Sequence, residues 1–336
     1  MRQMVAAGVE PWKSGFEKLR SHSQSRADYR LRGPAEIVHR PGPGSSELAS
    51  DANAAYQNAL MYWITGDDAH AKKAVEILDA WSGKLKTVAG HDAQLAAGLS
   101  GFKLVGAAEL IRSSAAGWPP QEIERAKTMF HRALYPTIRD FAIFANGNWD
   151  GACMKTVLAI GVFCDDRETF DRAIDYYQRG SGNGAITHYI INDAGQCQES
   201  GRDQSHTQLG LGQLAECCEV AWSQGIDIYA AGDNRLLSGF EYTARYNLGH
   251  DVPFVPHVDT TGKYRQTAIS PEGRGRLRPI WEMVWNHYHQ RMGLEMPYTQ
   301  QVVEQLRPEG AAFQADHAGF GTLLFAARKF EESPAR

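Results

Sequence analysis

The chain has no long hydrophobic run and no excess of basic charge, and each shortage excludes a class of protein. No run of about 18 apolar residues occurs, so the sequence predicts no membrane span. The formal net charge of the 336 residues is only -4. A nucleic-acid partner is not expected, because a phosphate backbone selects for a basic face. An anionic sugar polymer stays possible as a partner, since a local basic cleft can form on a mildly acidic protein.

Cysteine is also scarce, and familiar catalytic motifs are missing. An odd number of cysteines without CxxC spacing argues against a disulfide framework and against a zinc–thiolate site. No GxSxG elbow, P-loop or HExxH helix is present. We expect the thiols to be small buried side chains. The five cysteines are Cys153, Cys164, Cys197, Cys217 and Cys218.

What the chain does contain is a succession of amphipathic helical patterns. Segments rich in Ala, Gly and Leu, such as 91–113, alternate with more charged ones, such as 120–137. The first kind predicts helices buried on most sides, and the second predicts outer helices with one wet face. This alternation is typical of an α/α toroid. The predicted helices are 46–64, 67–83, 91–113, 120–137, 149–162, 168–180, 204–223, 234–248, 276–291 and 298–306.

Two stretches do not fit a helical pattern. Residues 183–200 combine a β-branched run with Gly-rich turns and predict a β-hairpin. Residues 249–275 are too long for a simple connection and predict a functional lid. We therefore predict an all-α fold, a toroid of about six to seven helical hairpins with a short β-hairpin and a long lid loop, forming one domain over 1–336.

Each predicted inner helix begins with polar residues, and the inner helices of a toroid all begin on one rim. We expect these polar groups to converge on one cavity mouth. The residues are Asp51 and Asn53, His91 and Asp92, Asn148 and Asp150, and Arg202, Asp203 and His206.

The densest polar segment is QCQESGRDQSHTQLGLG, residues 196–212. Arg202 and His206 are one helical turn apart and can face the same cavity. The alternative is an N-cap in which His206 is incidental. In ANGNWDGAC, residues 145–153, the Asn148 amide can donate to a substrate carboxylate or cap the helix. Trp149 can stack on a sugar ring or simply pack.

The lid and the segment after it supply further candidates. Three arginines within five residues at a predicted helix start favour an anion site, and a solvated basic run is the alternative. The sequence requires no cofactor. His257 with Asp259, or His250 with Asp251, offer a divalent cation a site, although such pairs also form simple hydrogen bonds. The three arginines are Arg274, Arg276 and Arg278.

An α/α toroid can also host a glycoside hydrolase, which needs a pair of carboxyl groups. Glu199 with Asp203, or Asp92 with Asp150, are the pairs that the sequence offers for that reaction. A hydrolase is therefore one interpretation of the sequence, and a non-catalytic carbohydrate-binding protein of the same fold is another.

Several ordered motifs resemble the alginate-lyase domain superfamily. They occupy 51–81, 147–163, 196–212 and 316–328, and the similarity extends over about residues 30–328. QESGRDQSHTQLGLG together with NWDGA is most similar to polysaccharide lyase family 38, whose members act on alginate or glucuronan. The resemblance implies an α/α toroid that cleaves a 1,4-linked uronate polymer by β-elimination and leaves 4,5-unsaturated ends.

The resemblance also implies roles for particular residues. Asn148 corresponds to the Asn that neutralises the uronate carboxylate, and His206 corresponds to the His of that site. Tyr264 is the candidate catalytic Tyr, with Tyr246 as the alternative. Arg278 is the candidate Arg, with Arg274 and Arg202 as competitors. The candidate substrate-binding residues are His91, Trp149, Arg202, Gln204, Tyr246 and Arg274.

The first 15 residues lack the apolar core of a signal peptide. From the resemblance we expect a secreted or periplasmic enzyme whose signal is absent from this sequence, and a cytoplasmic enzyme is the alternative.

Overall fold

The computed structural model describes residues 1–327 and shows the alternation of helices that the sequence predicts. Most helix ends lie within a few residues of the predicted ones. In chain order the principal helices are α3 (Ser45–Thr65), α4 (Asp68–Ser82), α5 (Ala93–Leu95) continuing through a π-helical turn (Ala96–Ser100) into α6 (Gly101–Arg112), α7 (Pro120–Met129) with a π-helical turn (Phe130–Leu134) and α8 (Tyr135–Ile138), α9 (Gly147–Phe163), α10 (Arg167–Arg179), α12 (Gln204–Ser223) and α13 (Ala231–Asn247).

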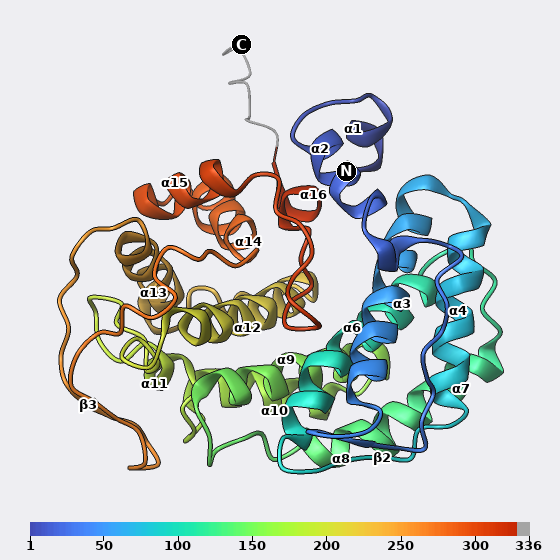
Figure 1. Ribbon diagram of the computed structural model, residues 1–336, viewed down its shortest axis with the longest axis horizontal. Coiled ribbons are helices and arrows are strands. Elements are labelled where there is room, and N and C mark those ends of the chain that lie inside the picture. The colour runs from blue at the N-terminus through green and yellow to red at the C-terminus, as the bar shows by residue number, and fades with distance from the viewer. Residues whose placement is uncertain (328–336) are drawn as a thin grey trace.

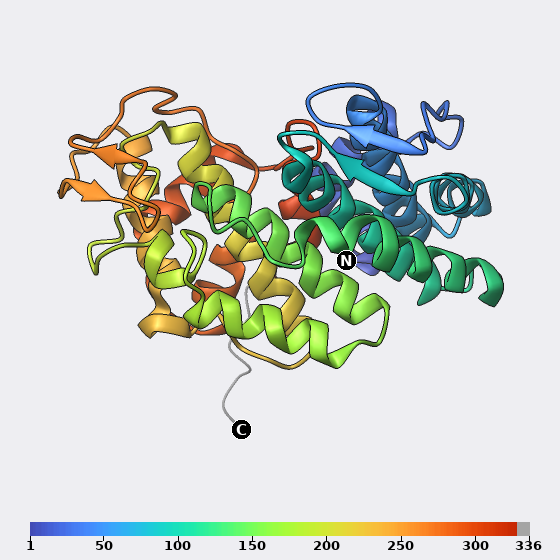
Figure 2. The same cartoon turned by 90° about the horizontal axis from the view of Figure 1, so that it is seen from below.

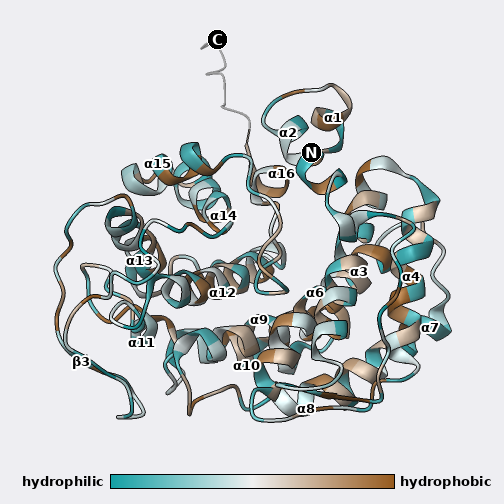
Figure 3. Ribbon diagram, viewed as in Figure 1, coloured by the Kyte–Doolittle hydropathy of each residue, from teal (hydrophilic) through white to brown (hydrophobic). Residues whose placement is uncertain are grey.

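These helices form two concentric rows. The inner row runs α3, α6, α9 and α12, and each member packs on the next. The outer helices α4, α10 and α13 pack on the inner helices α3, α9 and α12 that precede them in the chain. Figure 1 shows the resulting arc, from α3 and α4 through α9 and α10 to α12 and α13. The outer helix α4 shows both hydrophobic and hydrophilic residues in Figure 3, as a helix with one wet face should. The predicted toroid of inner and outer helices is confirmed.

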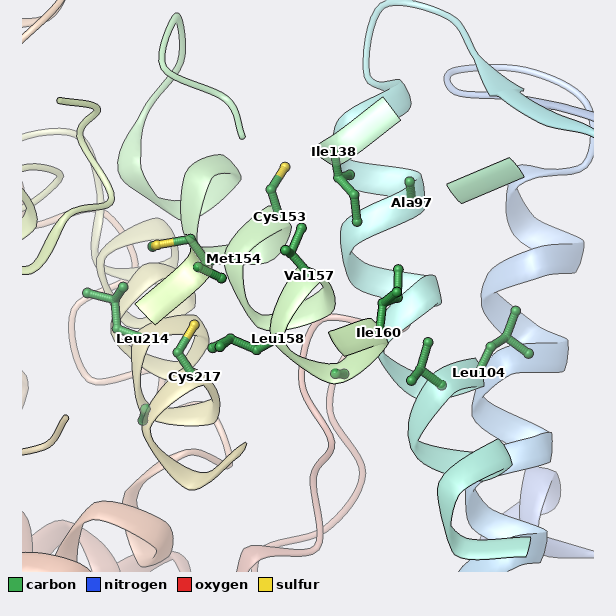
Figure 4. Close-up of a cluster of buried hydrophobic side chains, with 14 of the residues drawn as sticks. Ala97, Leu104, Ile138, Cys153, Met154, Val157, Leu158, Ile160, Leu214 and Cys217 are labelled. Atoms are coloured by element: carbon green, nitrogen blue, oxygen red, sulfur yellow. The ribbon is translucent and has the colours of Figure 1, made fainter. Parts of the chain in front are cut away.

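The core lies between neighbouring inner helices. Figure 4 shows Met154 and Leu158 of α9 close to Leu214 and Cys217 of α12. On the other side α9 approaches the π-helical turn before α6 so closely that a Cβ at Gly98 would lie 2.7 Å from the Ala152 carbonyl oxygen. Only glycine permits this contact, and α9 is consequently the most enclosed of the helices. All five cysteines are free thiols and four of them are buried, as predicted.

The first and last segments of the described chain meet and close the ring. The N-terminal helices α1 (Arg2–Ala6) and α2 (Trp12–Arg20) lie beside α16 (Gly321–Phe325), which also packs on α14. A Cβ at Gly15 would lie only 3.0 Å from the Leu323 backbone nitrogen, so this seam is tight. Leu19, Phe320 and Leu323 are fully buried there.

The structure corrects two predictions about local structure. Residues 183–200 are not a hairpin: they hold the short helix α11 (Ile186–Tyr189) and one antiparallel bridge between Ile190 and Cys197. Ile186, Tyr189 and Ile190 have the spacing of a helix face and are all buried, so burial outweighs β-propensity. The helix predicted from residue 276 begins only at Trp281, since Pro279 disfavours a helical conformation at Arg278.

Short strands occur elsewhere. β3 (His257–Val258) pairs antiparallel with β4 (Arg265–Gln266), and this arm belongs to the predicted lid. β1 (Ile37–His39) pairs parallel with β2 (Thr87–Ala89), which the sequence did not predict. Figure 2 shows both strand pairs on the same side of the molecule.

The remaining helices complete the C-terminal third. They are α14 (Trp281–Trp285), a π-helical turn (Asn286–Arg291) and α15 (Pro297–Leu306), with a single 3-10 turn (Ser23–Ser25) near the N-terminus. Among the described helices, none combines the length and the apolar character that crossing a membrane requires.

Candidate active site

The N-terminal ends of α9 and α12 are held together by a carboxylate. Glu199 is fully buried, and its Oε2 accepts a hydrogen bond from the Asn148 backbone nitrogen at 3.1 Å. Its Oε1 accepts from Asn148 Nδ2 at 2.7 Å and from Arg202 Nη1 at 2.8 Å. Glu199 thus caps α9 from a distant part of the chain, and it fixes both the Asn148 amide and the Arg202 guanidinium. Asn148 itself lies inside the first turn and is not the cap.

Keeping Glu199 ionised at this buried position costs free energy. Burial raises the pKa of its carboxyl, and the positive charge of Arg202 acts in the opposite direction. A buried carboxylate is tolerated when donors surround it. Asn148 donates one of its two Nδ2 hydrogens to Glu199, which leaves the other for a second acceptor.

His206 lies on the first turn of α12 between a carboxylate and a guanidinium. Its Nδ1 is 2.6 Å from Asp203 Oδ2, and its Nε2 is 3.1 Å from Arg202 Nη2. Arginine can only donate, so Nε2 accepts and Nδ1 carries the proton that is donated to Asp203. The structure therefore favours a neutral imidazole that Asp203 orients and whose Nε2 lone pair accepts from Arg202. Nε2 can act as a base once Arg202 bonds to another acceptor.

Asp203 also caps α12, since its Oδ1 accepts from the His206 backbone nitrogen at 2.7 Å. Burial acts to raise the pKa of Asp203, but hydrogen bonds from the His206 ring and backbone and the charge of Arg202 outweigh it, and the pKa is lowered. The cap predicted as an alternative role for this segment is therefore present, and the same carboxylate also pairs with the His206 ring.

A cavity of about 430 Å³ opens beside this cluster, under the lid. It brings together four of the predicted residues: His91, Trp149, Arg202 and Tyr264. The Trp149 ring meets the rings of His91 and Phe144 edge-on, each at 6.2 Å between centroids. Such an aromatic wall suits a sugar ring. The cavity is completed by Phe144, Ala145, Asn146, Lys263 and Gln266.

Tyr264 reaches the cavity because Asp259 shapes the lid arm. The Asp259 carboxylate accepts from the Tyr264 backbone nitrogen at 2.9 Å and from Asn183 Nδ2 at 2.7 Å. Burial acts to raise the pKa of Asp259, but these bonds and one from the Thr261 hydroxyl lower it. The Asp259 carboxylate is thus fully engaged in shaping the turn.

Within residues 1–327 no group of three or more His, Cys, Asp or Glu side chains is placed to hold a metal ion.

Arg278 lies on the other side of His206. Its Nε donates to the Ser205 carbonyl oxygen at 2.9 Å, and its Nη1 donates to Asp316 Oδ2 at 2.7 Å. Asp316 lines a second cavity of about 660 Å³, which is bounded by α3 and the loop that precedes α16. Trp149 packs beside Leu99 and Ala315 of that wall, so the two cavities are neighbours.

Six predicted residues do not line the cavity under the lid. Asn148 and His206 are joined to it through Glu199 and Arg202, Arg278 contacts Ser205, and the other three lie around the base of the lid. The Arg274 guanidinium lies 4.0 Å from the centre of the Tyr246 ring and donates to the Tyr246 carbonyl oxygen. Tyr246 is 5% exposed. The Gln204 side chain is fully buried and bonds to Asn247 and to the Ser270 carbonyl oxygen. Tyr246, Arg274 and Gln204 therefore anchor the base of the lid, away from Trp149 and Tyr264.

The carboxyl pairs considered for a hydrolase are not open to a substrate. Asp150 is fully buried and accepts from the backbone nitrogens of Ala142 and Gly184 and from the Tyr176 hydroxyl. Glu199 lies beneath Arg202. In each candidate pair, one carboxyl group is therefore engaged in structural hydrogen bonds and is not available as a catalytic acid or base.

The sequence analysis missed Phe144, Lys263 and Gln266 as cavity residues. Lys263 directly precedes Tyr264, and that position was the available signal. The sequence analysis also named Glu199 only as a possible acid of a hydrolase, since nothing in the sequence shows that the Glu199 side chain reaches Asn148.

Comparisons with known proteins show the family of the chain and relatives of its fold. The family described as "Alginate lyase" matches residues 25–252. A histidine-to-alanine variant of alginate lyase A1-III complexed with tetrasaccharide aligns with a TM-score of 0.70 and 15% identity, covering 98% of this chain and 93% of that chain. Alginate lyase A1-III from Sphingomonas species A1 gives 0.66 and 15%, covering 97% and 94%. An alginate lyase from Bacteroides ovatus gives 0.61 and 14%, covering 94% of each chain. No curated protein matches the sequence significantly.

Proposed function

The chain belongs to the alginate lyase family and is a polysaccharide lyase of uronate polymers, and on that premise we propose that it cleaves alginate or glucuronan in the cavity under the lid. One observation carries the proposal. Buried Glu199 holds Asn148 and Arg202 beside the Asp203–His206 pair, and Arg202 shares a cavity with Tyr264 and Trp149.

In the proposed reaction the uronate carboxylate lies against Arg202 and the free Nδ2 hydrogen of Asn148. These donors stabilise the enolate-like charge that develops when C5 loses its proton. Glu199 holds both donors in place before substrate binds. The Arg202 Nη2 that bonds to His206 Nε2 turns to the uronate carboxylate when substrate enters, which frees Nε2 for the proton.

We assign the proton transfers to two side chains. His206 Nε2 takes the C5 proton, while Asp203 stabilises the imidazolium that forms. The C5–H electrons form the C4–C5 double bond, the C4–O4 bond breaks, and the Tyr264 hydroxyl protonates the departing O4. Trp149 and His91 support the sugar ring, and Arg278 holds a carboxylate on the side of the larger cavity.

The first test is product chemistry. Purified protein is incubated with alginate and with glucuronan, and both the ultraviolet absorbance of unsaturated uronate and the release of reducing ends are followed. We expect both signals to rise together, with the larger kcat/KM identifying the natural polymer. Reducing ends without absorbance would instead indicate hydrolysis, and binding without either signal would indicate a non-catalytic protein.

The second test concerns the assigned residues. His206→Ala and Tyr264→Phe should each lower kcat by at least about 100-fold, the usual scale for an acid–base group. Tyr246→Phe is the matched control, since that hydroxyl lies outside the cavity, and it should retain nearly full activity. Near-normal turnover of Tyr264→Phe combined with loss in Tyr246→Phe would transfer the role to Tyr246.

A further inference from the structure

The loop 312–319 divides the inside of the ring into two cavities. Ala312, Gln314, Ala315 and Asp316 line the larger cavity, next to the proposed site. The residues that follow, 317–319, line a different cavity of about 490 Å³ toward the other ends of the inner helices. Figure 1 shows this red segment descending between α12 and α6 before it returns to α16. The loop therefore forms a floor between the two mouths of the ring.

The inner helices α3 and α6 hold one side of this floor. Asn53 Nδ2 donates to the Gln314 carbonyl oxygen at 2.6 Å. Lys103 Nζ donates to Asn53 Oδ1 at 2.5 Å and to the Ala318 carbonyl oxygen at 3.4 Å. Lys103 and Asn53 are both buried, which is unusual for a lysine.

The inner helices α9 and α12 hold the other side. Lys155 Nζ donates to the Asp316 carbonyl oxygen at 3.0 Å, and Gln213 Nε2 donates to the same oxygen at 2.9 Å. Glu216 Oε1 accepts from the Ala318 backbone nitrogen at 2.6 Å. All four inner helices thus direct a buried polar side chain at one short loop.

Two of these groups form a buried ion pair. Lys155 Nζ lies 2.6 Å from Glu216 Oε2, and the side chains are 0% and 5% exposed. Burial acts to raise the pKa of Glu216, but the charge of Lys155 more than compensates and lowers the pKa to about 2. Burying two charges brings little or no net stability compared with apolar side chains of similar volume. The position that the pair imposes on the loop is a better reason for its presence.

The position of the loop matters because the carbonyl oxygen and the carboxylate of Asp316 bond to different partners. Its carbonyl oxygen is held by Lys155 and Gln213, whereas its carboxylate holds Arg278 Nη1 at 2.7 Å. Arg278 in turn contacts Ser205, the neighbour of His206. Hydrogen bonds, linked through the covalent frame of Asp316 and of Ser205, therefore connect the ion pair to the proposed site.

We propose that Lys155 and Glu216 are positioning residues for substrate binding: they clamp the floor loop so that Asp316 directs the Arg278 guanidinium toward the substrate. The inference rests on the proposed function of Arg278 as a ligand for a uronate carboxylate. It adds two residues that are too deeply buried to contact substrate themselves.

A double-mutant cycle on the complete protein tests the inference. Lys155→Met and Arg278→Ala are made singly and together, and KM and kcat for the preferred polymer are measured on folded protein. Each single variant should raise KM by about 10-fold, as expected for a lost hydrogen bond to a charged group. In the Arg278→Ala background, Lys155→Met should change KM no further, because both act through the same guanidinium.

The controls separate the possible failures. Arg307→Met breaks another ion pair with a buried partner, Glu282, and should lower stability without changing KM. If Lys155→Met does not fold, Gln213→Leu removes a neutral bond to the same carbonyl oxygen and should raise KM in the same non-additive way. An unchanged KM in Arg278→Ala would refute the role of Arg278 in the proposed function. A raised KM in Arg278→Ala with additive or absent effects of Lys155→Met and Gln213→Leu would refute the clamp alone.

Discussion

Replacing Glu199 by Gln should weaken both the fold and the reaction, although the two side chains have nearly the same shape. Four donors surround the carboxylate: the Asn148 backbone nitrogen, Asn148 Nδ2, Arg202 Nη1 and the Tyr189 hydroxyl. A Gln amide offers one oxygen and one NH₂ group. If the oxygen serves Asn148 Nδ2 and Arg202, the NH₂ group faces the Asn148 backbone nitrogen, and two donors oppose each other.

The magnitude follows from these contacts. A buried donor left without an acceptor costs about 1–3 kcal/mol. Arg202 is 34% exposed, so water replaces much of its lost ion pair, and that loss adds roughly 1 kcal/mol or less. The free energy of unfolding should therefore fall by about 1–4 kcal/mol. Activity should fall by about 100-fold, because the donors for the enolate-like charge lose their common support.

Urea denaturation measures the first quantity, and the absorbance of the unsaturated product measures the second. Glu168→Gln is the matched control, since Glu168 is exposed on α10 and should behave as the parent protein does. A Glu199→Gln protein that unfolds within about 0.5 kcal/mol of the parent and retains most of its activity would refute the claim that Glu199 organises the site.

The remaining predictions concern other parts of the fold. Burial, together with the charge of Glu282, raises the pKa of Glu309 to about 8. The folded state therefore keeps a proton that the unfolded state loses near its usual pKa of 4.5, so this group reduces stability as pH rises from about 4.5 to 8. Glu309→Gln should flatten that decline in thermal unfolding measured against pH, and an unchanged slope would contradict the assignment. A Cβ at Gly210 would overlap the Tyr189 hydroxyl, so Gly210→Ala should lower unfolding free energy by about 1–3 kcal/mol in urea, and an unaltered midpoint would show that Tyr189 moves freely.

The sequence predicts the helical ring well because helix periodicity is a local signal. The limits of α12 (Gln204–Ser223) agree with the predicted ones, since Asp203 caps the helix from the adjacent position. Predictions from local sequence fail where contacts with residues distant in the chain determine the structure. Ile186–Tyr189 becomes a helix because its buried face packs within the fold, and α9 is capped by a residue 51 positions away.

The site shows the same division. Asn148, Arg202 and His206 could be nominated from their places at predicted helix starts. The sequence named Tyr264 of the predicted lid as the candidate and left Tyr246 as the alternative, and telling the two apart required three-dimensional information. Only the fold shows that Arg274 covers Tyr246 while Asp259 turns Tyr264 into the cavity. Nothing in the sequence indicated that Lys155 and Glu216 form a buried ion pair, since a charged residue on a predicted helix is expected to be exposed to solvent.

The order of the chain gives the floor loop a consequence for biosynthesis. The inner helices α3, α6, α9 and α12 precede loop 312–319 in the sequence, so they leave the ribosome before it does. Until the loop is in place, Lys103, Lys155 and Glu216 line a centre that nothing fills. Their charges favour contact with water there over close packing of the helices. The loop and the closing helix α16 are neighbours in the chain, so the nascent protein acquires its floor and closes its ring in one late event. A growing chain should therefore stay inactive toward the polysaccharide until synthesis has passed residue 325.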